Sequence, residues 1–109
     1  MSGYYDLKRS GDAYMFNLKA GNHEIILTSE RYTTKASAQG GIESVRKNSP
    51  ADARYQRKTA SNGAPYFSLT ATNGEIIGHS EMYSSASARG KGIESVKTNG
   101  PTATVKDNT

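Results

Sequence analysis

Apolar and polar residues alternate with two different periods along this chain, and the change of period occurs twice. Before residue 30 the apolar residues recur at every second position, as in Tyr14, Phe16 and Leu18, which is the spacing of a strand with one buried face. From about residue 34 to residue 48, apolar and small residues lie three and four positions apart, which is helical spacing. The same order follows between residues 55 and 101, so the chain holds two similar units.

A direct comparison of the chain with itself supports a duplication. Shifting the sequence by 51 positions aligns residues 4–50 with residues 55–101 without a gap, and 20 of the 47 pairs are identical. The clearest matches are NHEIILTSERY (22–32) with NGEIIGHSEMY (73–83), and GIESVRKNSP (41–50) with GIESVKTNGP (92–101). We interpret residues 4–50 and 55–101 as tandem copies of one β-β-β-α unit.

Turn residues and helix caps mark the elements within each copy. The first copy is predicted to have strands over 4–9, 14–20 and 24–30 and a helix over 34–48, and the second copy repeats them with a helix over 85–99. The hydroxyl residues Thr33, Thr34, Ser84 and Ser85 are available to cap the free N–H groups of the first helical turns, and Pro50 and Pro101 prevent the helices from continuing. Residues 104–106 can form a final short strand.

The size of one copy decides the fold class. A unit of 47 residues rarely buries enough surface to fold alone, so each copy is expected to need the other. We therefore predict an α+β fold in which residues 1–109 form a single domain. Its two repeats share one mainly antiparallel sheet, and both helices pack on one face. The expected molecule is a monomer with internal pseudo-twofold symmetry.

The paired blocks EIIxxSExY and GIESVxxN-P, the Tyr-rich start and the closing TVKDNT resemble the YegP-like family of uncharacterised bacterial proteins. The resemblance covers essentially the whole chain. It implies β3-α-β motifs, here as tandem repeats, that assemble into one sheet with exchange of the C-terminal strands. The resemblance brings no known activity, ligand or catalytic residue.

Composition narrows the function classes only a little. The chain has no cysteine, which excludes disulfides and thiolate metal sites, and it has no apolar run of membrane-spanning length and no leader-like start. A cytoplasmic location with no cofactor is the expectation. The net charge of +4 is compatible with a polyanionic partner, but each copy carries the same excess of two positive charges, so no basic arm stands out.

The candidates for catalysis have ordinary alternatives. His23 and His79 belong to different copies and face Gly74 and Thr28 in the alignment, so they are interpreted as surface residues. Glu30 and Glu81 could do acid–base chemistry if one were desolvated, whereas Glu43 and Glu94 have basic residues three positions later and are expected to form helix-surface ion pairs. Likewise, Tyr32 and Tyr83 could stack on a ligand but are expected to fill the strand-to-helix corner.

The sheet face opposite Phe16 and Leu18 is the remaining candidate site. If both helices cover the other face, this one is open, and open antiparallel sheets bind single-stranded bases in several folds. The candidate ligand residues on it are Met15, Asn17, Lys19, Tyr66, Ser68 and Thr70. The leading hypothesis is a non-enzymatic binding or structural module. The alternative is weak, sequence-tolerant binding of RNA or single-stranded DNA through this face.

Overall fold

The computed structural model describes residues 3–109 and contains one seven-stranded sheet, in the order β4-β5-β6-β3-β2-β1-β7. Each repeat contributes three antiparallel strands in sequence, and β3 meets β6 at the centre, where Thr28 pairs with His79. The predicted α+β fold with a shared sheet is therefore confirmed. The elements are β1 (Tyr4–Ser10), β2 (Ala13–Lys19), β3 (Ile25–Ser29), α1 (Lys35–Asn48), the 3₁₀ turn η1 (Asp52–Arg54), β4 (Tyr55–Thr59), β5 (Pro65–Thr70), β6 (Ile76–His79), α2 (Ala86–Asn99) and β7 (Thr104–Asp107).

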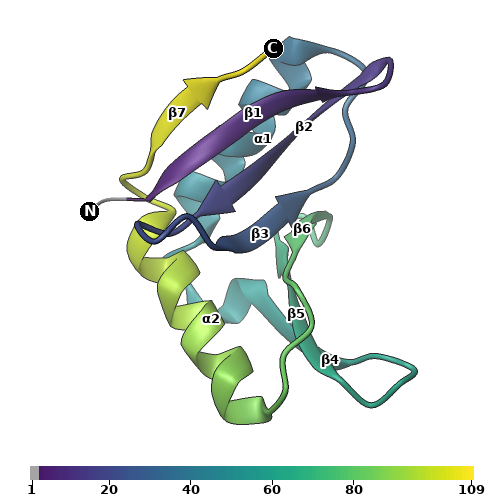
Figure 1. The fold of residues 1–109 in the computed structure, drawn as a ribbon, viewed down its shortest axis with the longest axis vertical. Coiled ribbons are helices and arrows are strands. Elements are labelled where there is room, and N and C mark those ends of the chain that lie inside the picture. The colour runs from purple at the N-terminus through teal and green to yellow at the C-terminus, as the bar shows by residue number, and fades with distance from the viewer. Residues whose placement is uncertain (1–2) are drawn as a thin grey trace.

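Both helices cover the same face of the sheet, and each touches both repeats (Figure 1). Helix α1 packs on β2, β5 and β6, and helix α2 packs on β5 and β3. Of the two predicted capping residues at each helix, the second is the cap, since Thr34 Oγ1 accepts from Ser37 N at 3.1 Å and Ser85 Oγ accepts from Ala88 N at 3.0 Å. Because each helix bridges the two halves, neither repeat closes its core alone.

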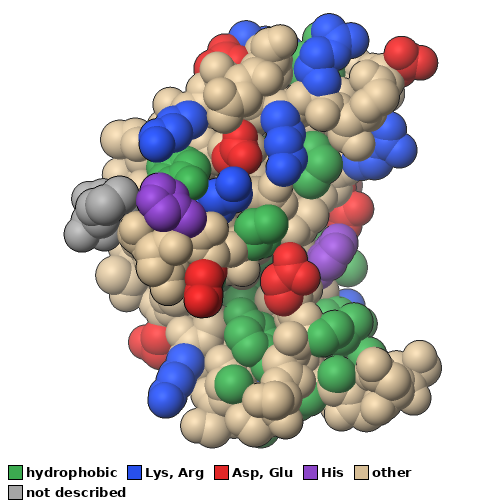
Figure 2. Space-filling model, viewed as in Figure 1, with side chains coloured by type: hydrophobic (Ala, Val, Ile, Leu, Met, Phe, Trp, Pro, Cys, Tyr) green, Lys and Arg blue, Asp and Glu red, His purple; other side chains and the backbone are tan. Residues whose placement is uncertain are grey.

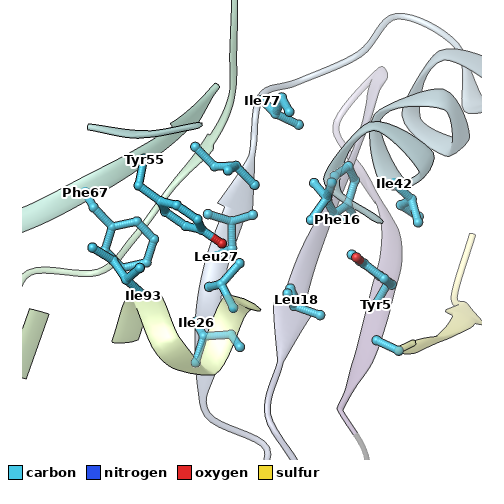
Figure 3. Close-up of a cluster of buried hydrophobic side chains, with 14 of the residues drawn as sticks. Tyr5, Phe16, Leu18, Ile26, Leu27, Ile42, Tyr55, Phe67, Ile77 and Ile93 are labelled. Carbon is cyan, nitrogen blue, oxygen red and sulfur yellow. The ribbon is translucent and has the colours of Figure 1, made fainter. Parts of the chain in front are cut away.

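The hydrophobic core lies between the helices and the sheet and runs through both repeats (Figure 3). Its two aromatic centres are equivalent, because Tyr5 meets Phe16 and Tyr55 meets Phe67 with ring centroids 5.7 Å apart in each case. Leu27 and Gly78 are equivalent positions at the repeat boundary, and a Cβ on Gly78 would lie 3.1 Å from the Leu27 side chain. The boundary therefore holds one large side chain where strict symmetry would place two.

A β-bulge interrupts the two-residue period in the third strand of each repeat. Leu18 pairs with Leu27 and Lys19 with Ile25, so Ile26 is the extra residue, and Ile26 and Leu27 are both buried. The second copy has the same shift between Leu69 and Thr70. The bulge separates Ile26, which lies in the core, from Thr28, which pairs with Asn17 on the opposite face. The predicted regular strand over 24–30 was wrong on this point.

The strand registers also refine the repeat alignment. Tyr5 pairs with Leu18 and Tyr55 pairs with Leu69, so these two tyrosines are structural equivalents although they lie 50 positions apart. Between the equivalent pairs Arg9–Tyr14 and Thr59–Pro65, the second repeat has five residues and the first has four, and this one extra residue restores the spacing of 51 from β5 onward. Each tyrosine hydroxyl then bonds the end of the helix from the other repeat: Tyr5 donates to Gly100 O at 2.6 Å and Tyr55 to Ser49 O at 2.7 Å.

The last strand crosses from the second repeat to the first, which is one direction of the strand exchange that the family resemblance implied. Strand β7 pairs in parallel with β1, and Tyr5 lies opposite Val105. Asn108 N donates to Leu7 O at 2.8 Å, and Asp107 forms an ion pair with Lys35 at 2.5 Å. These contacts tie the C-terminal strand to a strand and a helix of the first repeat.

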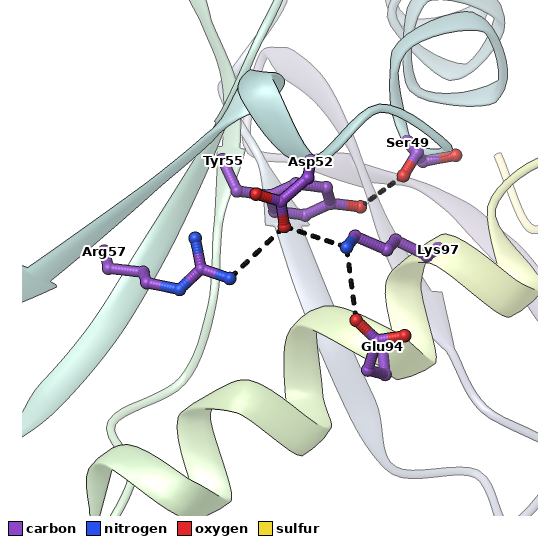
Figure 4. A network of polar contacts seen from close by, with 6 residues as sticks. All are labelled: Ser49, Asp52, Tyr55, Arg57, Glu94 and Lys97. Atoms are coloured by element: carbon purple, nitrogen blue, oxygen red, sulfur yellow. Dashed lines mark hydrogen bonds and ion pairs between the residues drawn. The ribbon is translucent and has the colours of Figure 1, made fainter.

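Within residues 3–109 the outer edge of β4 has no strand beside it, although β4 is the equivalent of β1. The chain passes directly from α1 through η1 into β4, so the first repeat has no separate closing strand. A polar network occupies this region instead, in which Asp52 accepts from Lys97 at 2.8 Å and from Arg57 at 3.3 Å (Figure 4). The two edges of the sheet are consequently different, despite the duplication.

No helix within the described residues 3–109 is long and apolar enough to cross a membrane. The radius of gyration of 13.0 Å is close to that expected for a compact body of about 100 residues.

Candidate binding surfaces

The six residues predicted as a ligand face lie on the sheet face turned away from the helices, which we call the outer face. Asn17, Ser68 and Thr70 are buried there, with exposed fractions of 3, 2 and 6%, so the prediction that they are open to a ligand was wrong. Neighbouring side chains are longer than these short polar groups, and internal bonds use two of them: Asn17 donates to Thr28 and Thr70 to Arg54 O. Binding by the half-buried Met15, Lys19 and Tyr66 stays a prediction.

The outer face of the first repeat carries a basic cluster, which we define as Lys8, Lys19 and Lys106 around Tyr4 and Asp6. Lys106 Nζ lies 4.2 Å and Lys19 Nζ 5.8 Å from the centre of the Tyr4 ring. Asp6 pairs with Lys19 at 3.2 Å and with Lys8 at 3.9 Å. The single carboxylate of Asp6 therefore pairs with two lysines, and the cluster has a net positive charge.

Burial acts to raise the pKa of Asp6, but hydrogen bonds from Asn108 and Lys19 and the charges of Lys19 and Lys8 outweigh it, so its pKa is lowered. The carboxylate consequently stays ionised and holds the lysines in place. Among the strand residues whose side chains lie on the outer face, Lys58 adds a fourth lysine, so Asp6 stands against four lysines. That excess of three compares with +4 for the entire chain. Figure 2 shows basic side chains gathered around an acidic one over β1 and β2.

The other charged candidates occupy separate places. Glu43 pairs with Arg46 and Glu94 with Lys97 on the helix surfaces, as predicted. His23 Nδ1 lies 2.9 Å from the Tyr4 hydroxyl, whereas His79 is exposed at the centre of the sheet. Among residues 3–109, no group of three or more His, Cys, Asp or Glu side chains could hold a metal ion.

Tyr32 and Tyr83 fill the strand-to-helix corners, which confirms the packing interpretation. Tyr32 stacks on Phe16 at 6.4 Å, and Tyr83 stacks on Phe67 at 6.2 Å. Each tyrosine lies against a helix glycine, Gly41 or Gly92, so closely that a Cβ there would meet the ring.

Each corner tyrosine also has two glutamates near it, one from each repeat. Burial first, and then the negative charges of Glu81 and Glu24, raise the pKa of Tyr83. The pKa of Tyr32 is raised in the same way by burial, Glu30 and Glu75. The duplication therefore produces two equivalent sites with one tyrosine and two carboxylates each.

A groove of about 730 Å³ opens beside Tyr83, between helix α2 and the start of β3, and we call it the α2 groove. Figure 2 shows a hollow in the middle of the molecule with acidic side chains beside it. Its volume falls in the usual range for small-ligand sites. The lining residues are Ala20, Asn22, His23, Glu24, Ile25, Ile26, Glu81, Tyr83, Ala88, Lys91, Gly92 and Ser95.

Sequence reasoning found neither this groove nor the basic cluster. The groove joins His23 to Lys91, and the cluster joins Lys8 to Lys106, so both depend on contacts between repeats. The only signal available in the sequence was the mismatch at aligned positions, where His23 faces Gly74 and Lys91 faces Gly40. Such mismatches become informative once the copies are known to share one surface.

Comparisons with known proteins agree on the family and name no activity. A family model described as a domain of unknown function, DUF1508, matches twice in tandem, at residues 10–56 and 60–107. A UPF0339 protein of Bordetella pertussis is 71% identical over 109 residues, which cover all of this chain and 98% of that protein. The UPF0339 protein YegP of Escherichia coli strain K12 is 58% identical over 110 residues, which cover all of both chains.

Two solved structures have the same fold. The solution NMR structure of E. coli yegP, described as a protein of unknown function, matches with a TM-score of 0.94 and 58% identity, over all of this chain and 95% of that one. The solution NMR structure of a UPF0339 protein from Shewanella oneidensis matches with a TM-score of 0.91 and 56% identity, over 98% and 92% of the two chains.

Proposed function

The chain belongs to the UPF0339 family, with the DUF1508 domain twice in tandem, and we propose that it acts by binding, not by catalysis, and that its partner is a polyanion such as single-stranded nucleic acid. The observation that carries the proposal is the position of the charge. Positive charge is concentrated on the outer face, where Lys19 and Lys106 lie over the Tyr4 ring and Lys8 and Lys19 share the Asp6 carboxylate. A concentrated positive surface attracts phosphates without reading sequence.

The duplication supports the non-enzymatic part of the proposal. Glu30 and Glu81, the candidates for acid–base chemistry, lie in two equivalent sites. Because the two repeats have the same fold, a residue present in both is explained first by a role in that fold. The basic cluster, by contrast, is complete only on the first repeat. Lys58 is the equivalent of Lys8, but Lys19 corresponds to Thr70, and within residues 3–109 no strand beside β4 supplies an equivalent of Lys106.

The role of the aromatic residues differs from the sequence-based hypothesis. Lysines lie over the Tyr4 ring at 4.2 and 5.8 Å, so a base would have to displace one of them to stack there. Tyr66, paired with Lys58, is the other aromatic group of the outer face. We therefore expect phosphate contacts to dominate, with affinity in the weak, strongly salt-dependent range of non-specific binding.

The test is a titration of a ten-nucleotide oligouridine into isotope-labelled protein at two salt concentrations. The variant Lys19→Gln/Lys106→Gln should bind more weakly and lower the slope of log K against log salt by about 1.4, if each lysine neutralises one phosphate. The control Arg31→Gln/Lys47→Gln removes the same charge elsewhere and should keep the native slope.

Asp6→Asn gives an independent check in the opposite direction. It removes the carboxylate that holds Lys8 and Lys19, so binding should become tighter. Equal salt slopes for the two double variants, or amide shifts that avoid β1, β2 and β7, would contradict the proposal.

A further inference from the structure

The two repeats differ in chemistry at the α2 groove. Its glutamates and its tyrosine have equivalents at the other corner, but His23 corresponds to Gly74 and Lys91 to Gly40. One corner therefore has a cation and an imidazole that the other lacks. They come from different repeats, since His23 lies in the β2–β3 turn and Lys91 on α2.

The backbone of His23 is an independent indication that this residue has a function. Its φ angle is 70°, and it is the one non-glycine residue with positive φ among residues 3–109, whereas its equivalent Gly74 has a φ of 86°. Glycine adopts this conformation without strain, but a residue with a Cβ does so at a cost of order 1 kcal/mol. Residues held in such conformations cluster at ligand sites.

The charged groups of the groove are free to meet a ligand. Within residues 3–109, Glu24, Glu81 and Lys91 form no ion pair. Glu75 and Glu30, their equivalents at the other corner, form none either, so Lys91 is the charge that distinguishes this corner. Burial first, and then the charges of Glu81 and Glu24, raise the pKa of Tyr83, which is consistent with a negative potential on the glutamate side of the groove. Lys91 adds a positive charge to the groove and forms no ion pair with either carboxylate.

The turn and the strand end hold these groups in fixed places. Glu24 N donates to Asn22 Oδ1 at 3.1 Å and Ala20 N to Glu24 O at 2.9 Å, so the turn is closed by two bonds. Ser80 Oγ donates to Glu81 O at 2.8 Å. Ile25, Ile26 and the Tyr83 ring add apolar lining, so an entering molecule can bury an apolar body as well.

We propose that the α2 groove binds a small zwitterion with an apolar body, of the class of a free aromatic or aliphatic α-amino acid. The ammonium group lies between Glu24 and Glu81, the carboxylate meets Lys91, and the side chain lies on Ile25, Ile26 and Tyr83. His23 Nδ1 is engaged by Tyr4, which leaves Nε2 for a further polar contact at the rim.

The experiment uses L-phenylalanine as the probe, with chemical shifts of the isotope-labelled full chain as the readout. Saturable shifts are expected at residues 20–26 and 81–95. Glu81→Gln and Lys91→Gln should each weaken binding at least fivefold. Glu30→Gln, the equivalent change at the other corner, is the matched control and should bind as the native chain does.

Phenethylamine and 3-phenylpropionate each keep one charge of the probe and should each bind at least fivefold more weakly. Absence of saturable shifts with millimolar L-phenylalanine overturns the proposal. So does equal weakening by Glu30→Gln and Glu81→Gln, or equal binding of either single-charge analogue. These measurements use no nucleic acid, so their failure leaves the outer-face proposal unaffected.

Discussion

Four helix glycines allow a sharp test of how the corner tyrosines position the helices. Gly40 and Gly90 have open space where a Cβ would be, whereas a Cβ on Gly92 would lie 2.6 Å from Cζ of Tyr83, and one on Gly41 would lie 2.7 Å from Cζ of Tyr32. All four lie inside helices. Replacing glycine with alanine therefore improves the helix propensity equally at all four positions, but the added methyl group is in open space at two of them and against a tyrosine ring at the other two.

The magnitudes follow from those surroundings. Alanine gains about 0.8 to 1 kcal/mol over glycine within a helix, so Gly40→Ala and Gly90→Ala should stabilise the protein by up to that amount. Overpacking a tight site costs about 1 to 3 kcal/mol. Because Tyr83 is stacked on Phe67, its ring has little room to withdraw. Gly92→Ala should thus be about 1 to 3 kcal/mol less stable than Gly90→Ala.

The assay is thermal and urea unfolding of the four single variants. At about 4 °C per kcal/mol for a chain of this size, the two members of each pair should differ in Tm by roughly 4 to 12 °C. Tyr83→Leu should reduce the difference between the Gly90 and Gly92 variants, because the clashing ring is gone. If Gly92→Ala were as stable as Gly90→Ala, the close approach of helix to corner would not determine the packing.

Three further outcomes follow from the fold. Tyr5→Phe and Tyr55→Phe each leave a buried carbonyl without its donor, so each should cost about 1 to 2 kcal/mol in urea unfolding, and a negligible loss in either would contradict the inter-repeat role of these bonds. A fragment of residues 1–58 should be unfolded or dimeric by size-exclusion chromatography and circular dichroism, and a folded monomer would refute the shared core. The folded pKa of Asp6 lies below its unfolded value of about 3.9, so its contribution is complete above that value and is lost as the pH falls through the folded pKa. Asp6→Asn should flatten the loss of stability as the pH falls below about 4, and an unchanged acid profile would exclude this carboxylate as a cause.

Local chemistry made much of the fold predictable. The caps at Thr34 and Ser85, the helix ends at Asn48 and Asn99 and the surface ion pair of Glu43 with Arg46 each depend on residues a few positions apart. The repeat supplied the remaining step, because a unit too small to fold alone must share its core. Strand alternation failed at Ile26, where the bulge puts two neighbouring side chains into the core.

Contacts between the repeats could not be predicted from the sequence, and the candidate sites are formed by such contacts. The basic cluster needs Lys106 beside Tyr4, which follows from the crossing of β7. The α2 groove needs Lys91 and His23 on one surface. Aligned copies predict what the copies share, whereas these sites arise where the copies differ. The burial of Ser68 could not be predicted for a related reason. The alternation of residues along a strand gives the face on which a side chain lies, but not whether longer neighbouring side chains cover it.

The parallel pairing of β1 with β7 also determines how the molecule would respond to force. The chain enters β1 at Tyr4, opposite Thr104, and leaves β7 at Asp107, opposite Leu7, so its two ends depart from opposite ends of the same ladder. Tension applied between the termini would load the bonds of that ladder together, in shear, and would not peel them apart one by one. The last strand should therefore act as a mechanical clamp. Single-molecule pulling from the two termini should give a higher rupture force than pulling between residues 60 and 109, and equal forces would argue against the clamp.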